Sequence, residues 1–354
     1  MSSSGRQTFV RPVVRAMTGY VPGEQPQDRR YVKLNTNENP YPPSPRVIEA
    51  VRAAATEDLR LYPDPLANAV RDRAAAVYGV RRENVLVGNG SDELLNLVVR
   101  ACVGAGDRVV YPYPTYSLYD TLVVIQEGEV VHVPYPDDFS LPNGLAEAGG
   151  CVTFVCHPNS PSGTPVSIER IDALARAVPG LLVVDEAYVD FATASALPLL
   201  ERCDNVVILR TFSKAFSLAG MRVGLAFGPA GVIEDLLKVK DSYNVTRASI
   251  AAAAAALDDC DWMQANVARI CATRVRLTAA LRERGFAVLP SEANFVLARR
   301  PGRSLEAVYQ GLKSGGVLVR YFATPELFDA LRITVGTDAE IDALLRALDA
   351  IVLP

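Results

Sequence analysis

Six short runs of apolar, mostly β-branched residues constrain the fold of this chain more than any other feature, and longer stretches with helical spacing lie between them. A strand that is buried on both faces reads as a continuous apolar run, and such strands occur in mainly parallel sheets connected by helices. The runs occupy residues 85–87, 108–111, 130–133, 152–155, 181–184 and 206–209. The sequence therefore predicts an α/β fold with a large, mainly parallel sheet.

The segment before the first of these runs has two parts. Residues 1–45 are rich in proline and polar residues, so we expect an arm without regular elements. Helical spacing follows over residues 47–56 and 66–78, and Gly79 suits a left-handed C-cap at the end of the second helix.

The segment after residue 260 predicts a second unit. It contains a long helical stretch over 262–284, strand candidates at 286–289, 295–297, 317–319 and 331–335, and a final helix over 338–351. Since about 100–200 residues form one domain, a chain of 354 residues is expected to form two. We predict a large α/β domain over 46–260, and a small α+β domain over 261–354 to which the arm 1–45 belongs.

Composition narrows the class of protein. The net charge is −4 and no basic run exceeds a pair, so a nucleic-acid partner is not expected. The start of the chain lacks the apolar core of a secretory signal, and the alanine run 251–256 is far shorter than the roughly 20 residues that span a membrane. We read that run as a packed core helix and expect no membrane association. Six scattered cysteines indicate reduced thiols in a cytoplasmic protein, and with only two histidines a histidine-ligated metal is not expected.

Two chemically suggestive features lie where loops leave the ends of strands, which is where an open parallel sheet binds its ligands. The glycine-rich segment 87–95 runs from a strand into a helix, whose free N–H groups suit a phosphate, although helix capping by Ser91 or Asp92 explains the pattern equally well. Asp185 ends the apolar run 181–184, where a carboxylate can keep a heterocyclic nitrogen protonated. A metal-binding acid or a helix cap would explain the same carboxylate, but no phosphate-loop motif accompanies it.

Two further features follow strands. Lys214 stands among small and apolar residues after the last run, where burial favours the neutral amine that forms imines, and Ser213 and Arg222 flank it as anion ligands. Asn159 lies in a turn braced by prolines, and its amide can donate to a phenolic oxygen, although such turns also form for purely local reasons.

Together these motifs resemble those of one family. Their order along the chain is the glycine-rich helix start at 88–91, Asn-x-Pro-x-Gly at 159–163, Asp-Glu-Ala-Tyr at 185–188, Ser-Lys-x-Phe at 213–216 and Leu-Arg-Ile-Thr-Val-Gly-Thr at 331–337. This order is similar to that of fold-type I aminotransferases of the class II group, which depend on pyridoxal 5'-phosphate, and specifically to the histidinol-phosphate aminotransferase family. The resemblance covers nearly the whole chain, and the motifs are specific jointly although each is weak alone.

The resemblance implies a role for each matching position. Lys214 would carry the cofactor as a Schiff base and later move the proton between the substrate and the cofactor. Asp185 would pair with the ring nitrogen, Asn159 and Tyr188 would bond the 3'-oxygen, and Tyr116 would stack on the ring. The residues around the cofactor phosphate would be Gly90, Ser91, Asp92, Thr211, Ser213 and Arg222.

The same resemblance implies a homodimer and an anion-binding pocket. Tyr62 matches a tyrosine that reaches the phosphate of the neighbouring subunit's site. Arg332 and Arg320 match the arginines that hold the substrate's carboxylate or phosphate, because a guanidinium suits both anions. Tyr20, from the partner's arm, and Asn37 are further candidates, for which ordinary packing and turn formation would be the purely structural explanation.

The predicted reaction is that of a histidinol-phosphate aminotransferase, in which L-histidinol phosphate and 2-oxoglutarate give imidazole acetol phosphate and L-glutamate in histidine biosynthesis. An aromatic amino-acid (phenylalanine or tyrosine) aminotransferase shares all the cofactor residues. A threonine-phosphate decarboxylase would fit the same cofactor motifs. So would a non-catalytic regulator that senses pyridoxal phosphate, although the arm is too short to be its DNA-binding module. His157 stands where the family commonly has asparagine, which predicts a change in the loop or in substrate preference.

Overall fold

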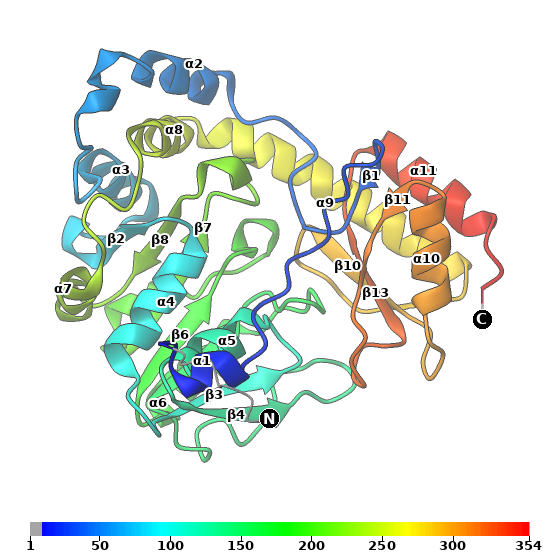
Figure 1. The fold of residues 1–354 in the computed structure, drawn as a ribbon, viewed down its shortest axis with the longest axis horizontal. Coiled ribbons are helices and arrows are strands. Elements are labelled where there is room, and N and C mark those ends of the chain that lie inside the picture. The colour runs from blue at the N-terminus through cyan, green and yellow to red at the C-terminus, as the bar shows by residue number, and fades with distance from the viewer. Residues whose placement is uncertain (1–8, 354) are drawn as a thin grey trace, which may run out of the picture.

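The computed structural model describes residues 9–353, which form a seven-stranded sheet, a smaller four-stranded second sheet and a two-stranded pair (Figure 1). The large sheet has the order β2-β8-β7-β6-β5-β3-β4. Its strands are β2 (Val85–Gly88), β3 (Arg108–Tyr113), β4 (Glu129–Pro134), β5 (Val152–Cys156), β6 (Leu181–Asp185), β7 (Val206–Thr211) and β8 (Gly224–Phe227). The six apolar runs of the sequence are therefore strands of one mainly parallel sheet. Only β8, which the sequence analysis did not predict, runs antiparallel to its neighbours β2 and β7.

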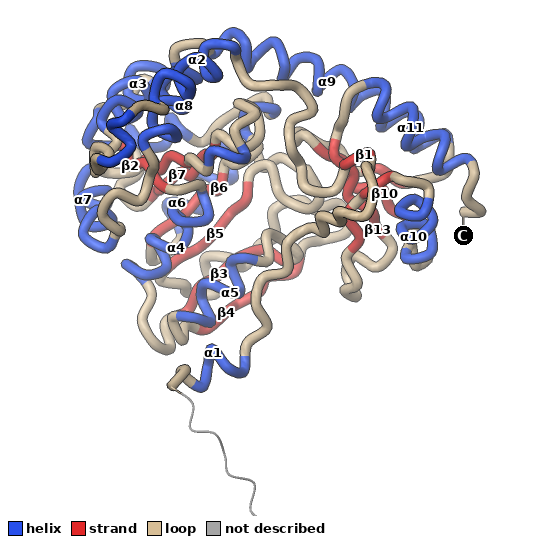
Figure 2. The backbone as a smooth tube through the Cα atoms, turned by 45° about the horizontal axis from the view of Figure 1, so that its top comes forward, coloured by secondary structure: helices blue, strands red, loops and turns tan. Residues whose placement is uncertain are grey.

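Helices cover both faces of this sheet (Figure 2). They are α2 (Pro45–Ala54), α3 (Asn68–Tyr78), α4 (Ser91–Cys102), α5 (Leu118–Ile125), α6 (Ile168–Ala177), α7 (Ala230–Val239) and α8 (Arg247–Leu257). Apolar residues of α4, α5 and α7 pack in one core cluster, and those of α3, α6 and α8 pack in the other. Because successive strand residues point to opposite faces, Val183 of β6 belongs to one cluster and Val184 to the other. The alanine run lies in α8, as predicted.

The helix ends follow the sequence closely. Gly79 ends α3 with φ +68°, as the left-handed cap requires. Short 3-10 helices occur at Glu57–Arg60, Arg82–Asn84, Val189–Phe191, Leu197–Glu201 and Ala219–Met221. No helix within residues 9–353 has the length and apolarity that a bilayer crossing requires.

The chain after residue 260 builds the second sheet. The long helix α9 (Cys260–Glu283) leads from α8 toward this second sheet (Figure 1). The strand order of the second sheet is β12-β13-β10-β9. Its elements are β9 (Ala287–Val288), β10 (Phe295–Arg299), α10 (Glu306–Ser314), β11 (Val317–Leu318), β12 (Arg320–Tyr321), β13 (Ala330–Thr334) and α11 (Asp338–Asp349). The predicted strands and final helix are present, whereas α10 and β12 were not foreseen. The division into domains at residues 46, 260 and 261 remains a prediction.

The arm corrects one expectation, because it contains regular elements. Pro12 starts the short helix α1 (Pro12–Ala16), which lies beside α5, and proline is favoured in the first turn since its missing N–H would be unpaired there. Strand β1 (Val32–Lys33) pairs in parallel with β11. The arm thus begins against the large sheet and ends hydrogen-bonded to the C-terminal part of the chain. The first eight residues lie outside the described range.

Candidate active site

A cavity of about 240 Å³ lies where the carboxyl ends of β5, β6 and β7 face the arm and the strands β12 and β13. Most of the residues that the sequence singled out contribute to its wall. They are Tyr20, Asn37, Ser91, Asp92, Tyr116, Asp185, Tyr188, Thr211, Ser213, Lys214, Arg222, Arg320 and Arg332. Gly90, Asn159 and Tyr62 do not line it.

One end of the cavity is built around the start of α4. Gly90 has φ +85° and precedes Ser91, the first residue of the helix. A Cβ at residue 90 would lie 2.6 Å from Nη2 of Arg222, and a Cβ at Gly224 would lie 2.6 Å from the backbone nitrogen of Ser91. Glycine at both positions thus lets the helix start approach β8 and Arg222. The free N–H groups of that first turn, with the helix dipole behind them, suit an anion.

Hydroxyls and a guanidinium complete this anion cradle. Arg222 donates from Nη1 to Oγ of Ser213 at 3.2 Å and from Nη2 to Oδ2 of Asp92 at 3.2 Å. The hydroxyls of Thr211 and Ser213 are 3.0 Å apart. Three donors from β7 and the loop after it therefore meet the helix start, and a phosphate needs this set of donors.

Asp185 is a buried carboxylate at the end of β6. Its Oδ2 accepts a hydrogen bond from the hydroxyl of Tyr119 at 2.7 Å, and its Oδ1 accepts one from the backbone N–H of Ala187 at 3.1 Å. Burial raises the pKa of Asp185 to about 6, and the bond from Tyr119 opposes that rise. Within residues 9–353 no lysine or arginine forms an ion pair with Asp185, so a cationic ligand group would satisfy it.

Lys214 follows β7 and its amine faces the same cavity. Its Nζ lies 3.5 Å from the backbone oxygen of Thr36 and 5.7 Å from the centre of the Tyr188 ring. Burial, and after it the positive charge of Arg332, lowers the pKa of Lys214 to about 8. More of the amine is therefore neutral near physiological pH than in an ordinary lysine, and both nucleophilic attack and proton abstraction require the neutral form.

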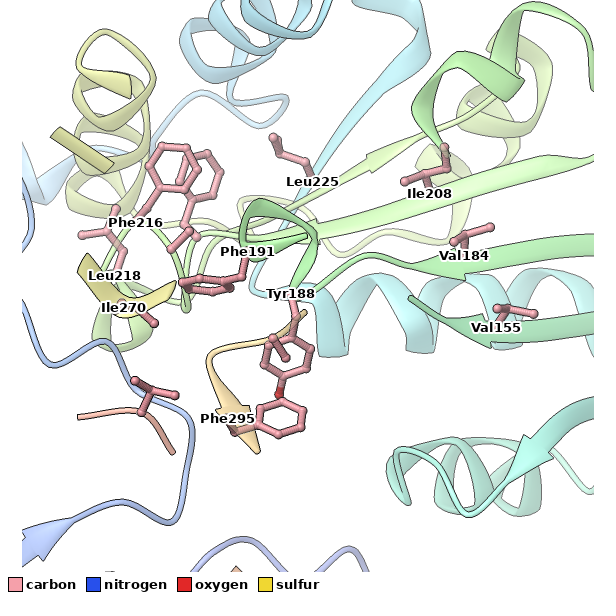
Figure 3. Close-up of a cluster of buried hydrophobic side chains, with 14 of the residues drawn as sticks. Val155, Val184, Tyr188, Phe191, Ile208, Phe216, Leu218, Leu225, Ile270 and Phe295 are labelled. Carbon is pink, nitrogen blue, oxygen red and sulfur yellow. The ribbon is translucent and has the colours of Figure 1, made fainter. Parts of the chain in front are cut away.

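Tyr188 is braced from the second sheet. Its ring meets that of Phe295 on β10 edge to face, with 5.0 Å between the ring centres (Figure 3). Its hydroxyl accepts a hydrogen bond from Nδ2 of Asn37 at 3.0 Å. Asn37 thus joins the arm to the site. The sequence marked Asn37 only as a further candidate for substrate binding, and the structure places it in contact with Tyr188.

Asn159 does not line the cavity, although its neighbour Ser160 does. Its side chain is fully buried: Nδ2 donates to Oγ of Ser162 at 2.9 Å, and Oδ1 accepts from the hydroxyl of the cavity-lining Thr115 at 2.8 Å. The bond from its amide to the cofactor's phenolic oxygen stays a prediction. A turn rich in hydroxyls offers the amide local partners, which the spacing of the motif does not reveal.

Two arginines stand side by side at the other end of the cavity. Arg320 and Arg332 are directly opposite each other on the antiparallel strands β12 and β13. Nη1 of Arg332 donates to Oγ of Ser160 at 3.2 Å, while its buried Nε has no partner, and Arg320 donates to two backbone oxygens of the arm at 3.0 and 3.1 Å. Like charges directly opposite repel. Because no carboxylate within residues 9–353 is paired with either, an anionic ligand would relieve that repulsion.

The two remaining tyrosines take different places. Tyr20 lines the cavity of its own chain, with its ring 5.7 Å from that of Tyr116. That the partner's arm supplies this tyrosine to the neighbouring site stays a prediction. Tyr62 is 77% exposed and stacks on Tyr243 at 4.4 Å, away from the cavity.

Comparison with known proteins identifies the family. Residues 29–348 match the family described as aminotransferase class I and II. Histidinol-phosphate aminotransferase 1 of Trichormus variabilis is 46% identical over 342 residues, which cover 96% of this chain and 98% of that protein. The chain belongs to the histidinol-phosphate aminotransferase family. The corresponding protein of Geotalea uraniireducens is also 46% identical, over 340 residues covering 96% of this chain and 98% of its own.

A solved structure agrees with this assignment. The histidinol-phosphate aminotransferase of Sinorhizobium meliloti in complex with pyridoxal-5'-phosphate has a TM-score of 0.90 to this chain at 30% identity, covering 99% of this chain and 100% of its own. The predictions of the family, of an aminotransferase and of the fold-type I α/β class are therefore confirmed.

The sequence analysis missed several residues of this aminotransferase's site. Thr36, Glu38 and Phe322 line the cavity, and Tyr119 bonds Asp185 behind it. Glu38 had a usable signal, since it stands beside Asn37 in the arm, and its carboxylate accepts from the Thr36 hydroxyl at 2.6 Å. Tyr119 had none, because a tyrosine on an apolar helix normally indicates core packing.

His157 braces two loops of the aminotransferase outside the cavity. Its Nδ1 accepts from the backbone N–H of Val166 at 3.0 Å, and its Nε2 lies 3.1 Å from the backbone oxygen of Ala194. The ring is buried, and both of its nitrogens lie within hydrogen-bond distance of backbone groups. His157 does not line the cavity, and its effect on the loop or on substrate preference stays a prediction.

Proposed function

We propose that this enzyme transfers the amino group between L-histidinol phosphate and 2-oxoglutarate with pyridoxal 5'-phosphate as cofactor, giving imidazole acetol phosphate and L-glutamate. It would act in histidine biosynthesis, in the cytoplasm. Relatives with this name at 46% identity over nearly the full length support the reaction, and the solved complex with pyridoxal-5'-phosphate supports the cofactor.

The side chains fit the cofactor's three binding groups. The anion cradle of Ser91, Thr211, Ser213 and Arg222 would hold the phosphate, with Gly90 and Asp92 shaping it. Asp185, a buried carboxylate without a cation, would hold the ring nitrogen, and Lys214 would hold the aldehyde carbon. Tyr116 would stack on the ring, and Tyr188 would bond the phenolic oxygen. When bound, pyridoxal phosphate supplies an electron sink for the reacting carbon of the substrate.

The chain's own residues would perform the remaining steps. Lys214, with a neutral amine available near pH 8, accepts the proton of the substrate's α-carbon and returns it across the same face of the site. The opposed guanidinium groups of Arg320 and Arg332 orient the substrate through its anion. The arm, joined to the site through Asn37 and Tyr20, excludes water from the reacting atoms.

The position of Arg320 opposite Arg332 is the observation on which we base the proposed substrate. A phosphate monoester holds close to two negative charges at neutral pH, whereas a carboxylate holds one. Two guanidinium groups on facing strands, without a carboxylate partner among the described residues, match the doubly charged anion. They also accept the carboxylates of glutamate in the other half of the cycle.

An aromatic amino-acid aminotransferase is the second candidate, because the rings of Tyr20, Tyr116 and Phe322 line the same cavity. Single-turnover rates of the cofactor-loaded protein with L-histidinol phosphate and with L-phenylalanine decide between them. We expect fast transfer from histidinol phosphate and slow transfer from phenylalanine. The reverse order would refute the proposed substrate and leave the aminotransferase class intact.

Replacing Arg320 by glutamine is expected to slow transfer from histidinol phosphate by about 10- to 100-fold, the value of one charge-assisted contact. Transfer from phenylalanine should fall by less than about tenfold, since one carboxylate is satisfied by Arg332 alone. Single-turnover kinetics with both donors measures the difference. Arg303→Gln, which changes an exposed arginine, is the control, and equal losses for both donors would contradict the assignment.

The pH dependence of cofactor capture tests Lys214. Only the neutral amine attacks an aldehyde, so we expect the rate at which cofactor-free protein captures pyridoxal phosphate to rise with pH through about 8, the pKa of Lys214. Stopped-flow absorbance on both sides of that pH measures the profile. Arg332→Gln should move its midpoint upward, because a positive charge that lowers this pKa is removed. A profile that is flat across this pKa would contradict the assignment.

We also propose a homodimer in which the partner subunit's Tyr62 reaches the cofactor phosphate. Tyr62 is 77% exposed and lies away from the cavity of its own chain, beside other exposed apolar residues. These are Ile48, Leu59, Leu61, Leu66 and Tyr243. Tyr62 stacks on Tyr243, and exposed apolar side chains of this kind suit a protein interface.

Tyr62→Phe is expected to weaken pyridoxal phosphate binding by roughly tenfold or more, because a hydrogen bond to a charged phosphate is lost while the ring remains. Equilibrium dialysis of the cofactor measures this, and sedimentation should still report a dimer. Tyr31→Phe removes a hydroxyl that bonds Asp28 outside the cavity and serves as the control. Unchanged affinity in Tyr62→Phe would remove this tyrosine from the site.

A further inference from the structure

Asp185 depends on a single side chain for its hydrogen bonding. The carboxylate is 2% exposed, and its two bonds come from the Tyr119 hydroxyl at 2.7 Å and the Ala187 backbone N–H at 3.1 Å. The other titratable groups around it are the thiol of Cys156 on β5, Tyr188, Asp92 on α4 and Glu186 after β6. None of these donates a hydrogen bond to the carboxylate: the thiol donates to the backbone oxygen of Pro158, and Asp92 and Glu186 are themselves acids.

The neighbouring acid Glu186 is occupied elsewhere. Its Oε2 forms an ion pair with Nη2 of Arg210 at 2.9 Å, and the two side chains are buried behind the strand ends. The positive charge of Arg210 is thus already matched, and it is not bonded to Asp185. Tyr119 is therefore the one side chain of the described residues that donates a hydrogen bond to Asp185.

Packing fixes the Tyr119 hydroxyl in place. Tyr119 lies in the first turn of α5 and is completely buried. Its ring stacks on Phe154 of β5 with 4.7 Å between centres and 14° between planes, and meets Tyr111 and Tyr116 edge to face at 5.5 and 5.7 Å. Three aromatic neighbours leave the ring no second orientation, so its O–H points at Asp185 before any ligand arrives.

We propose that Tyr119 is a positioning residue that keeps Asp185 ionised and oriented, so that the proton shared with the cofactor stays on the ring nitrogen. The inference rests on the proposed function, because it takes Asp185 as the partner of that nitrogen. Tyr119 does not line the cavity, and it would act on the cofactor only through Asp185, by keeping the ring nitrogen protonated.

The direction of the effect follows from electrostatics. Burial disfavours a carboxylate, and a donated hydrogen bond favours it. Without the Tyr119 hydroxyl the carboxylate binds a proton more tightly, and the proton moves from the nitrogen toward Asp185. A hydrogen bond to a charged group corresponds to a change of about 10- to 100-fold in this partition.

The test uses Tyr119→Phe with Tyr111→Phe as its matched control. Tyr111 is a buried tyrosine of the same aromatic cluster, but its hydroxyl bonds Asp120 at 2.7 Å and not Asp185. Each full-length protein is loaded with pyridoxal phosphate carrying a nitrogen-15 label in the ring, and the nitrogen chemical shift is followed with pH. We expect a protonated nitrogen in the wild type and in Tyr111→Phe, and a shift toward the neutral form in Tyr119→Phe.

A double variant that also carries Asp185→Asn shows whether the nitrogen-15 shift in Tyr119→Phe arises through Asp185 or from a loss of folding stability. If Tyr119 acts through Asp185, then Tyr119→Phe should cause no further shift in an Asp185→Asn background, where the nitrogen is already neutral. A protonated nitrogen in Tyr119→Phe, or equal shifts in the two phenylalanine variants, would overturn the inference. If the wild-type protein fails to bind the labelled cofactor, the proposed function itself fails, and the two failures are thus distinguishable.

Discussion

Replacing Lys214 by alanine is expected to abolish covalent capture of pyridoxal phosphate and to slow amino transfer by at least about 10²- to 10⁴-fold, the contribution of a positioned acid–base group. In the proposed function the amine of Lys214 is both the nucleophile that captures the cofactor and the base that moves the substrate's proton, so one substitution would remove both roles. Borohydride reduction followed by mass spectrometry of the chain measures covalent capture, and single-turnover kinetics with histidinol phosphate measures transfer.

The fold should survive this change. Lys214 forms no ion pair in the described residues, and a buried amine costs stability when it is charged. Lys238→Ala, at an exposed lysine bonded to Asp235, is the matched control and should keep full capture and activity. If the alanine variant at 214 still yields a chain with the cofactor attached by reduction, another residue is the nucleophile and the assignment is wrong.

Features of the fold that depend on neighbouring residues could be predicted from the sequence, whereas features that depend on residues distant in the sequence could not. Buried strands are specified by their own residues, which is why the apolar runs from 85–87 to 206–209 reappear as β2 to β7. Strand β8 is only four residues long and enters the sheet between β2 and β7, which are distant in sequence. Its pairing is a property of the whole sheet, and no local pattern predicts it.

The same distinction applies to the site. Asp185 and Lys214 stand at strand ends in unusual local surroundings, so the sequence marks them. The opposition of Arg320 and Arg332 depends on the register of β12 and β13, and the role of Tyr119 depends on the packing of α5 against β5. The partners of the Asn159 amide are likewise hydroxyls that only the folded chain brings to it, so the local motif does not reveal them.

Asp185→Asn is expected to lower the rate of amino transfer by about 10²- to 10³-fold, the usual cost of losing one preorganised electrostatic group. A neutral amide cannot keep the ring nitrogen of the cofactor protonated, and the unprotonated ring withdraws electrons from the substrate less strongly. Single-turnover kinetics measures the loss. Asp190→Asn is the control, because it removes another carboxyl nearby in the chain, which is partly buried and does not line the cavity. A rate within a few-fold of the wild type would separate Asp185 from the chemistry.

Asp185→Asn should increase the folding stability of the cofactor-free protein at neutral pH while it lowers the activity. Burial raises the pKa of Asp185 from 3.8 to about 6, so its contribution to folding is favourable below pH 3.8 and is lost as the pH rises through 6. The cost of the charged form above pH 6 is about 3 kcal/mol. Asparagine avoids this cost and keeps the bond from Tyr119, but it loses the weaker bond from the backbone N–H of Ala187, which offsets part of the gain. Urea unfolding of the cofactor-free proteins should therefore show a more stable asparagine variant above pH 6 and no difference below pH 3.8. A variant that is inactive and also less stable at neutral pH would indicate that Asp185 serves the fold, whereas an inactive but more stable one marks a charge kept for catalysis.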